Sequence, residues 1–481
     1  MRRSQAIKRI LVLWMPVIGY VLQTAAYAWL WFHVYYPIVS TPTISVDGYN
    51  LGGGLKLYQN GHLLVLAIYF VLLIFASRTF GGTKVGYLKF TDAFLSQIFE
   101  LVMADAISYA QISLMNNWLV PVRPMLIFLL FQIALAGGWT VLSDLLYRKV
   151  FPPRDLLIIY DEKFPPDDII AKFNSRQDMF SVKKTLNLQD ESGEVDLDRL
   201  CEECRSGGYG AVVLWDIPTP VRNKLLKFCY SESIRVYMMP KIPDVLIQGS
   251  SQMHLFDTPI YVVRDYAMKT EQRILKRTID VVCALILTVI ASPVMLVTAI
   301  CIHAYDKGPV LYKQIRCTQY GREFEIMKFR SMRENAEKDG KAVLAKQNDD
   351  RITPVGHFIR KVRIDELPQL FNILKGDMSV IGPRPERPEI IAQYMEEMPE
   401  FAYRMKVKAG LAGYAQVYGK YNTTPYDKLK LDLTYIQNYS VRLDLKLMLL
   451  TLKILLKPES TEGVSENQTT AAKPHPERTD E

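Results

Sequence analysis

The stretch that decides the fold is VVCALILTVIASPVMLVTAICI, residues 281–302. Its length suits a membrane helix, since about 20 apolar residues cross the hydrocarbon core of a bilayer. Ser292 and Pro293 interrupt it near its middle, and a proline there removes one helical hydrogen bond and bends the helix. Basic residues flank the segment on both sides, which favours two ends on the same side of the membrane. We therefore expect a re-entrant helix over about 279–304, with a kinked spanning helix as the alternative.

Four apolar segments of membrane-spanning length come before this one. They are Ile10–Tyr35, His62–Ser77, Ala93–Met115 and Met125–Tyr147. The third is the weakest, because it carries Glu100 and Asp105. The first is too long for a cleavable signal peptide, so we expect it to stay attached. Lys and Arg gather before the first segment, after the second and after the fourth. This distribution predicts a four-helix transmembrane bundle over residues 1–150 with both ends in the cytoplasm.

Residues 151–268 show a different pattern, in which short apolar strands alternate with helix-like stretches. We expect strands at Leu156–Tyr160, Ala211–Trp215 and Ile234–Met239, and helices at Leu197–Cys204 and Val221–Tyr230. Such alternation predicts a cytosolic Rossmann-like α/β domain with a parallel sheet. The first strand leads into Tyr160-Asp-Glu-Lys-Phe164 and not into a glycine-rich phosphate loop. A structural or regulatory role is therefore favoured over cofactor binding.

The composition agrees with a membrane protein that has soluble parts. Of 481 residues 49% are hydrophobic, and the net charge is +8. A basic balance suits anionic lipid and phosphorylated substrates, although nucleic-acid binders share it. The six cysteines are scattered, and Cys201 and Cys204 lack the second pair or histidines of a zinc site. We expect free thiols in a reducing compartment and no nucleic-acid partner.

The stretch Arg360-Lys-Val-Arg-Ile-Asp365-Glu366-Leu-Pro-Gln369 sets two adjacent carboxylates among cations. In phosphate chemistry one such carboxylate attacks phosphorus while the other helps to hold a divalent metal. Lys328 and Arg330 alternate along a predicted strand and form a candidate cationic wall, or else a solvated face. Arg384 lies between two prolines that preset its backbone, which suits bidentate phosphate binding, with a structural ion pair as the alternative.

Six motifs in this order resemble those of a known family. They are Lys276-Arg-Thr-Ile-Asp280, Gly308-Pro-Val-Leu-Tyr-Lys-Gln314, Lys328-Phe-Arg-Ser-Met332, Asp365-Glu-Leu-Pro-Gln369, Gly376-Asp-Met-Ser379 and Gly382-Pro-Arg-Pro385. They resemble the bacterial sugar transferase family, the monotopic phosphoglycosyl transferases, whose catalytic domain would occupy 269–457. With the upstream bundle and α/β domain, the chain is similar to the long members of that family. These are polyprenyl glycosylphosphotransferases of exopolysaccharide and capsule assembly, such as undecaprenyl-phosphate glucose or galactose phosphotransferases.

The resemblance implies a reaction at the cytoplasmic face of the bacterial inner membrane. A sugar 1-phosphate passes from a nucleoside diphosphate sugar, here a UDP-sugar, to undecaprenyl phosphate in the bilayer, and a nucleoside monophosphate is released. Asp365 matches the nucleophile that forms a phosphosugar-enzyme intermediate, and Glu366 matches its Mg²⁺-binding partner. Arg360 matches a phosphate-binding arginine, and Ser292-Pro293 matches the break of the re-entrant helix. Gln369, Tyr414 and Gln416 are candidates for nucleotide-sugar binding, although a buried hydrogen bond explains Gln369 equally well.

Two positions depart from the family pattern, because Ala409 and Ala412 stand where a proline and a threonine are usual. These changes keep a second hypothesis open, a non-catalytic membrane scaffold or regulator of a polysaccharide assembly complex.

We expect Val441–Lys457 to form an interfacial helix on anionic lipid, with a core helix as the alternative. Residues 458–481 are polar and predict a disordered tail. The large bundle and the α/β domain offer surfaces for a homodimer.

Overall fold

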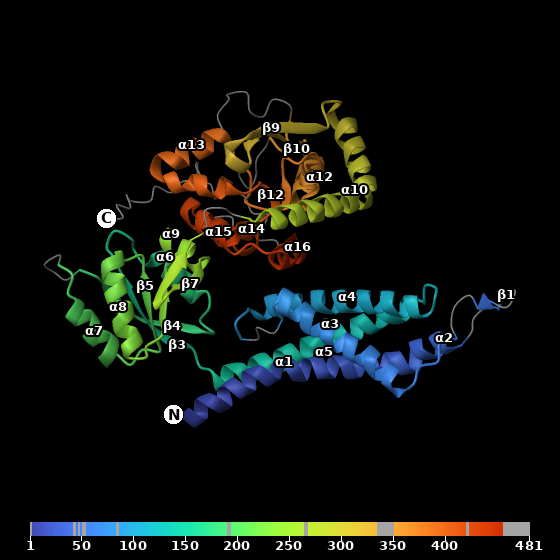
Figure 1. Cartoon of the computed structure of the whole chain (residues 1–481), viewed down its shortest axis with the longest axis horizontal. Coiled ribbons are helices and arrows are strands. Elements are labelled where there is room, and N and C mark those ends of the chain that lie inside the picture. Colours follow the sequence, from blue (N-terminus) through green and yellow to red (C-terminus); the bar gives the residue numbers. More distant parts are fainter. Residues whose placement is uncertain are drawn as a thin grey trace. The chain divides into compact units, whose positions relative to one another are not determined.

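The computed structural model describes residues 2–41, 45–46, 49–50, 54–82, 86–189, 194–263, 268–333, 351–419 and 423–455. The predicted tail, 458–481, lies outside the described residues. The chain divides into two compact units, Met1–Met239 and Pro240–Glu481. Helices and strands are labelled in Figure 1.

The four N-terminal apolar segments are helical, as predicted. They form α1 (Arg2–Leu30), continued by a π-turn (Trp31–Tyr35) and α2 (Tyr36–Ser40), then α3 (Gln59–Phe80), α4 (Phe90–Met115) and α5 (Arg123–Val150). Two short strands, β1 (Ser45–Val46) and β2 (Tyr49–Asn50), pair between α2 and α3. Among the described residues, α3, α4, α5 and the later α10 (Thr270–Asp306) are long and apolar enough to cross a membrane. The chain is therefore that of a membrane protein, while the crossing of α1 stays a prediction.

The bundle accommodates both carboxylates of α4 in its interior. Asp105 is buried and accepts a hydrogen bond from the Tyr69 hydroxyl of α3 at 2.8 Å. Glu100 is buried and accepts one from the Gly82 backbone N–H at 2.8 Å. Because buried polar groups are costly only when they lack partners, these bonds explain how so polar a segment joins the bundle.

Residues 154–238 form a parallel sheet with strand order β4-β3-β5-β6. Its strands are β3 (Arg154–Tyr160), β4 (Phe180–Asn187), β5 (Ala211–Trp215) and β6 (Val236–Met238), and its helices are α6 (Asp167–Asn174), α7 (Leu197–Ser206) and α8 (Thr219–Ser231). The predicted α/β layer with a parallel sheet is confirmed. β4 was not predicted, because this strand at the edge of the sheet carries the exposed Lys183 and Lys184, which hide its apolar alternation.

The second unit contains α10 and the segments that follow it. It begins with α9 (Ile242–Gln248) and the hairpin β7 (Ser251–Leu255) and β8 (Thr258–Val262). After α10 come β9 (Leu311–Cys317), β10 (Glu323–Phe329), α11 (Pro354–Lys361), α12 (Gln369–Lys375), β11 (Ser379–Ile381), α13 (Pro388–Glu397), β12 (Gly410–Ala412), α14 (Tyr414–Tyr418), α15 (Pro425–Gln437) and α16 (Val441–Leu455). Three 3₁₀ turns interrupt them, Gln319–Gly321, Ile364–Glu366 and Pro399–Lys406. β9 pairs with β10 antiparallel, and β11 pairs with β12 parallel.

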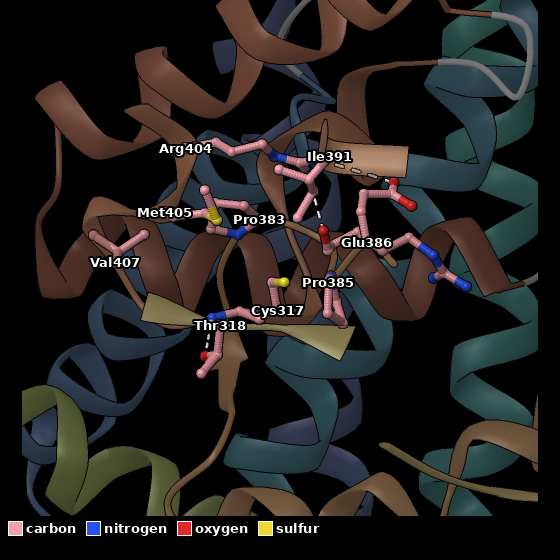
Figure 2. A pocket seen from close by; sticks show the side chains of 11 residues that line it. Cys317, Thr318, Pro383, Pro385, Glu386, Ile391, Arg404, Met405 and Val407 are labelled. Carbon is pink, nitrogen blue, oxygen red and sulfur yellow. Dashed lines mark hydrogen bonds and ion pairs between the residues drawn. The ribbon is translucent and has the colours of Figure 1, made fainter. Parts of the chain in front are cut away.

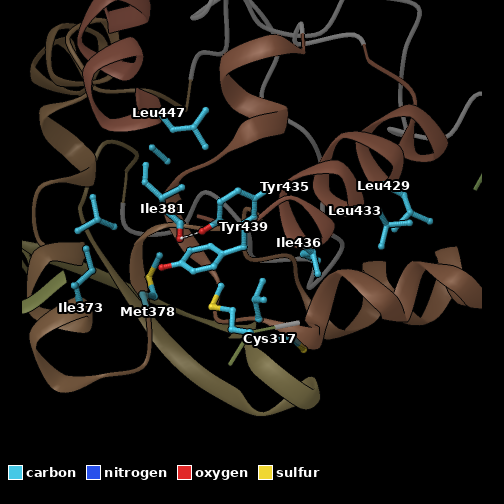
Figure 3. Close-up of a cluster of buried hydrophobic side chains, with 14 of the residues drawn as sticks. Cys317, Ile373, Met378, Ile381, Leu429, Leu433, Tyr435, Ile436, Tyr439 and Leu447 are labelled. Atoms are coloured by element: carbon cyan, nitrogen blue, oxygen red, sulfur yellow. Dashed lines mark hydrogen bonds between the residues drawn. The ribbon is translucent and has the colours of Figure 1, made fainter. Parts of the chain in front are cut away.

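The core of this unit gathers side chains from α12, β11, α15 and α16, as Figure 3 shows around Ile381, Tyr435 and Leu447. Leu447 of α16 is fully buried, and so is Asp444 one turn earlier. This face of α16 confirms the alternative of a core helix. Leu445 and Leu452 remain exposed on the same helix, so an interfacial role for its outer face stays a prediction.

α10 is bent, and Figure 1 shows two straight halves that meet at an abrupt turn. Pro293 lies inside the helix and cannot donate to the Val289 carbonyl one turn earlier. The Ser292 hydroxyl donates to that same carbonyl at 2.8 Å. Ser292 thus satisfies the acceptor that the proline leaves open, which is how an apolar helix tolerates the break.

Candidate active site

A tight turn between α11 and α12 carries the two adjacent carboxylates. Arg363 adopts a left-handed backbone conformation with φ 56°, which ends the helical course of α11. One 3₁₀ turn then holds Asp365 and Glu366, and Pro368 starts α12. A proline favours a helix start because its φ is preset and its missing N–H has no helical partner there. The turn is therefore short and locally determined.

Glu366 is held by two cations from distant segments. Its Oε1 lies 2.8 Å from Nη2 of Arg384 and 3.4 Å from Nζ of Lys328. The Glu366 side chain is 13% exposed and that of Arg384 is 42% exposed. Because the Arg384 side chain is partly exposed and its guanidinium has five N–H donors, it can bind an incoming anion while it binds Glu366.

The two neighbouring carboxylates have opposite electrostatics. Burial alone would raise the pKa of Glu366, but the nearby cations, above all Arg384 and Lys328, outweigh burial and hold it well below its ordinary value. The pKa of Asp365 is raised from 3.8 to about 6, first by burial and then by the charge of Glu366. Glu366 is thus a permanent anion, whereas Asp365 is a carboxylate of increased basicity that is still ionised at neutral pH.

The other predicted cations lie around this pair. Arg360 is on α11, and its positive charge lowers the pKa of Asp365 against the effect of burial. Lys328 is the penultimate residue of β10, and burial lowers its own pKa. Arg330 follows the end of β10 and is buried, with its guanidinium against Gly308. The predicted strand is confirmed for Lys328, but Arg330 lies just beyond it.

Arg384 belongs to the loop Gly382-Pro383-Arg384-Pro385, which directly follows β11 and is here called the phosphate loop after the role predicted for Arg384. Two arginines that the sequence did not single out as site residues fix this loop, the buried Arg404 and the half-buried Arg316. Arg404 donates from Nη2 to the Arg384 carbonyl at 2.9 Å and pairs with the buried Asp432 at 2.9 Å. Arg316 donates to the Pro385 carbonyl at 3.3 Å. Figure 2 shows the pocket beside the loop, with Arg404 and Thr318 on opposite sides of it.

The departure at Ala409 has a structural counterpart. The Ala409 N–H donates to the Thr318 hydroxyl at 3.1 Å, and that hydroxyl donates to the Asp377 carbonyl at 2.8 Å. A proline at 409 has no N–H and would lose the first of these bonds. The segment before β12 is therefore tied by Thr318, so the loosening that a missing proline suggests is offset by a hydrogen bond.

The remaining candidates lie near the phosphate loop or in the first turn of α12. Gly413 precedes α14 and comes so close to Gly382 that a Cβ there would collide with the Gly382 carbonyl. Tyr414 and Gln416 of α14 thus start next to the loop, and Gln416 donates to the Leu411 carbonyl at 3.2 Å. Gln369 is only 3% exposed in the first turn of α12, which favours its structural alternative.

The donor set fits a metal ion that is shared with a substrate. No group of three or more His, Cys, Asp or Glu side chains in the described part of the chain could hold a metal ion. Both cations that bind Glu366 contact Oε1, which leaves Oε2 on the same group as an acceptor. Mg²⁺ commonly uses one or two carboxylates together with substrate phosphates, and Asp365 with Glu366 supplies that number.

Comparison with known proteins agrees with the motifs. The model of a family described as "Bacterial sugar transferase" matches residues 271–458. The UDP-glucose:undecaprenyl-phosphate glucose-1-phosphate transferase of Caulobacter vibrioides is 40% identical over 191 residues, which are 38% of this chain and 71% of that protein. The chain belongs to the bacterial sugar transferase family.

Longer members of this transferase family are matched over a smaller share of their length. The UDP-N-acetylgalactosamine-undecaprenyl-phosphate N-acetylgalactosaminephosphotransferase of Aeromonas hydrophila is 38% identical over 245 residues, 49% of this chain and 55% of that protein. The UDP-glucose:undecaprenyl-phosphate glucose-1-phosphate transferase of Escherichia coli is 32% identical over 263 residues, 53% of this chain and 56% of that protein. The chain thus spans about half the length of these curated relatives.

Proposed function

We propose that this protein transfers a sugar 1-phosphate group from a UDP-hexose to undecaprenyl phosphate and releases UMP. This step would begin the synthesis of an exopolysaccharide, a capsule or an O-antigen. The observation that carries the proposal is the Asp365–Glu366 pair, in which one carboxylate is fixed by cations and the other is more basic than usual. The relatives' names support the reaction class, since they act on undecaprenyl phosphate with UDP-glucose or UDP-N-acetylgalactosamine.

The proposed chemistry has two displacements at one phosphorus atom. An Asp365 oxygen attacks the phosphorus that bears the sugar, the bond to the bridging oxygen breaks, and UMP leaves with that electron pair. An oxygen of undecaprenyl phosphate then attacks the same phosphorus and returns Asp365 as a carboxylate. The Asp365 carboxylate and the substrate diphosphate are both negative and repel each other. The positive charges of Arg384 and Lys328 reduce this repulsion.

Raising the pKa of Asp365 serves this role directly. A carboxylate with a pKa of about 6 is a better nucleophile than an ordinary aspartate and is still mostly ionised at pH 7. Asp365 and Glu366 would hold Mg²⁺ together with the substrate diphosphate, and the ion would add positive charge next to the departing oxygens.

Basic residues on both sides of the apolar segment of α10 support an active site on the cytoplasmic face, and the contacts of α10 support a re-entrant helix. Its first half binds β11 through Asp280, which accepts from the Val380 N–H at 2.9 Å. Its second half packs Met295 and Ile302 against Phe329 of β10. Both ends therefore contact the same soluble domain, which a straight spanning helix would not allow.

The test is the release of UMP from a panel of UDP-sugars by the full chain in vesicles with undecaprenyl phosphate and Mg²⁺. We expect one sugar to support release and Asp365→Asn to abolish it. Glu389→Gln is the matched control, because Glu389 is an exposed carboxylate on α13 of the same domain. No release from any sugar would favour the scaffold hypothesis instead. Full release by Asp365→Asn would overturn the assignment of Asp365 as the nucleophile.

A further inference from the structure

The motif Lys276-Arg277 on α10 has no part in the chemistry above, yet both side chains reach the elements that carry the site. Arg277 donates from Nη1 to the Ile373 carbonyl at 2.6 Å and from Nη2 to the Leu374 carbonyl at 2.8 Å. These are last-turn carbonyls of α12, at the negative end of the helix dipole. One guanidinium therefore fixes the far end of the helix that starts right after Asp365 and Glu366.

Lys276 reaches the other half of the site. Its buried Nζ donates to the Ile381 carbonyl at 2.9 Å and pairs with Asp444 at 2.8 Å. Ile381 is the last residue of β11, and the next residue, Gly382, opens the phosphate loop. Figure 3 shows the Ile381 carbonyl also facing the hydroxyl of Tyr435, at 3.3 Å.

Asp280, one turn further along α10, completes the attachment of β11. It accepts from the Ser379 hydroxyl at 2.7 Å and from the Val380 N–H at 2.9 Å. All three residues of β11 are thus bound by side chains of α10, Ser379 and Val380 through Asp280 and Ile381 through Lys276. Consecutive helical residues point about 100° apart, so Lys276 and Arg277 can hold two different elements from one turn.

We propose that Lys276 and Arg277 are positioning residues of the transferase site, which set the spacing between the Asp365–Glu366 turn and the phosphate loop. The turn leads into α12 and the loop directly follows β11, so the 2.8 Å contact between Glu366 and Arg384 depends on how these two elements are placed. α10 holds both, which connects the geometry of the site to the seating of the membrane helix. The inference rests on the proposed function.

Arg277 offers a cleaner test than Lys276. Removing Lys276 would leave the buried carboxylates of Asp444 and Asp280 without their cation, and the fold would suffer. Arg277 binds uncharged carbonyls, so its loss leaves no buried charge. Arg277→Lys keeps the positive charge but replaces the planar guanidinium with one ammonium group, which cannot bind both carbonyls in the same geometry. Arg273 is the matched control, since it lies one turn earlier on α10 and is exposed.

The first readout is kcat/KM for UMP release by the full chain. We expect Arg277→Met to lower kcat/KM by about 10- to 100-fold, the effect of a small misplacement of reacting groups. Arg277→Lys should recover part of the rate, and Arg273→Met should behave as the native chain.

The second readout is hydrogen–deuterium exchange, which needs no activity. Arg277→Met should speed exchange at Gly376 and Asp377, whose N–H groups bond to the last turn of α12, and in β11, but not in α15. Unchanged exchange there, or a reduced rate that Arg277→Lys does not partly recover, would overturn the positioning role. A native chain that releases no UMP while Arg277→Met alters exchange would refute the proposed function but not the attachment.

Discussion

Asp365 and Glu366 are adjacent, yet neutralising them should change stability in opposite directions. The folded protein holds the pKa of Asp365 at about 6 instead of 3.8, so it binds this proton more tightly than the unfolded chain does. Stability from such a group is complete at acid pH and is lost as the pH rises through 6. Above that pH the ionised carboxylate costs about 3 kcal/mol, at 1.36 kcal/mol for each pKa unit. Asp365→Asn removes this cost.

The difference between Asp365→Asn and the native chain should therefore grow with pH. About 2 of the 3 kcal/mol should develop between pH 4.5 and pH 8, which raises the melting temperature of the catalytic domain by roughly 4 to 8 °C. Glu366→Gln is the matched comparison. Its lowered pKa stabilises the fold at neutral pH, so the substitution should lower the melting temperature at pH 8.

The assay must report on the second unit, because all six tryptophans precede residue 240. Cys317 is buried in this unit and becomes reactive when it unfolds. Labelling of Cys317 with a dithiodipyridine, which reacts with thiols at acid pH, followed by mass spectrometry gives the unfolding curve of the full chain in detergent. A melting difference for Asp365→Asn that is independent of pH, or a lower melting temperature at pH 8, would refute this account of the pair.

Three further predictions concern the site and its supports. For the native chain, kcat/KM for UMP release should fall as the pH drops through about 6, where Asp365 takes up its proton, and a profile flat down to pH 5 would contradict the assignment. Arg384→Lys should lower kcat/KM by about 10- to 100-fold in the same assay, because one ammonium group cannot bind Glu366 and phosphate at once as the planar guanidinium can. A native rate would argue against phosphate binding by Arg384. Ala409→Pro, which introduces the family's usual residue, should destabilise the domain by about 1 kcal/mol, because the Thr318 hydroxyl loses the N–H that donates to it. Cys317 labelling measures this change, and a gain in stability would contradict the prediction.

The features that were predictable from sequence are those that depend on neighbouring residues. Apolar runs gave the membrane helices, and Ser292-Pro293 gave the bend of α10, because a proline acts on its own turn. The adjacent carboxylates of Asp365 and Glu366 are visible as a motif. Their different electrostatics are not, since these come from Lys328 and Arg384, which lie far from them in the chain.

The features that were missed depend on contacts between distant segments. Nothing beside Arg404 in sequence indicates that it binds the Arg384 carbonyl, and nothing beside Thr318 indicates its bond to Ala409. Lys276 was visible as part of a motif, but its contact with the Ile381 carbonyl of β11, 105 residues away, was not. A polar side chain that is buried by the fold cannot be told from an exposed one by local pattern alone.

The most direct test of the central claim is the mass of the protein after mixing with a UDP-sugar and Mg²⁺ in the absence of undecaprenyl phosphate. If Asp365 attacks phosphorus, the chain should gain the mass of one sugar phosphate with one equivalent of UMP released. The added mass should map to the peptide that contains Asp365, and later addition of undecaprenyl phosphate should remove it. Turnover with the lipid present but no added mass in its absence, or an adduct on another residue, would contradict the claim.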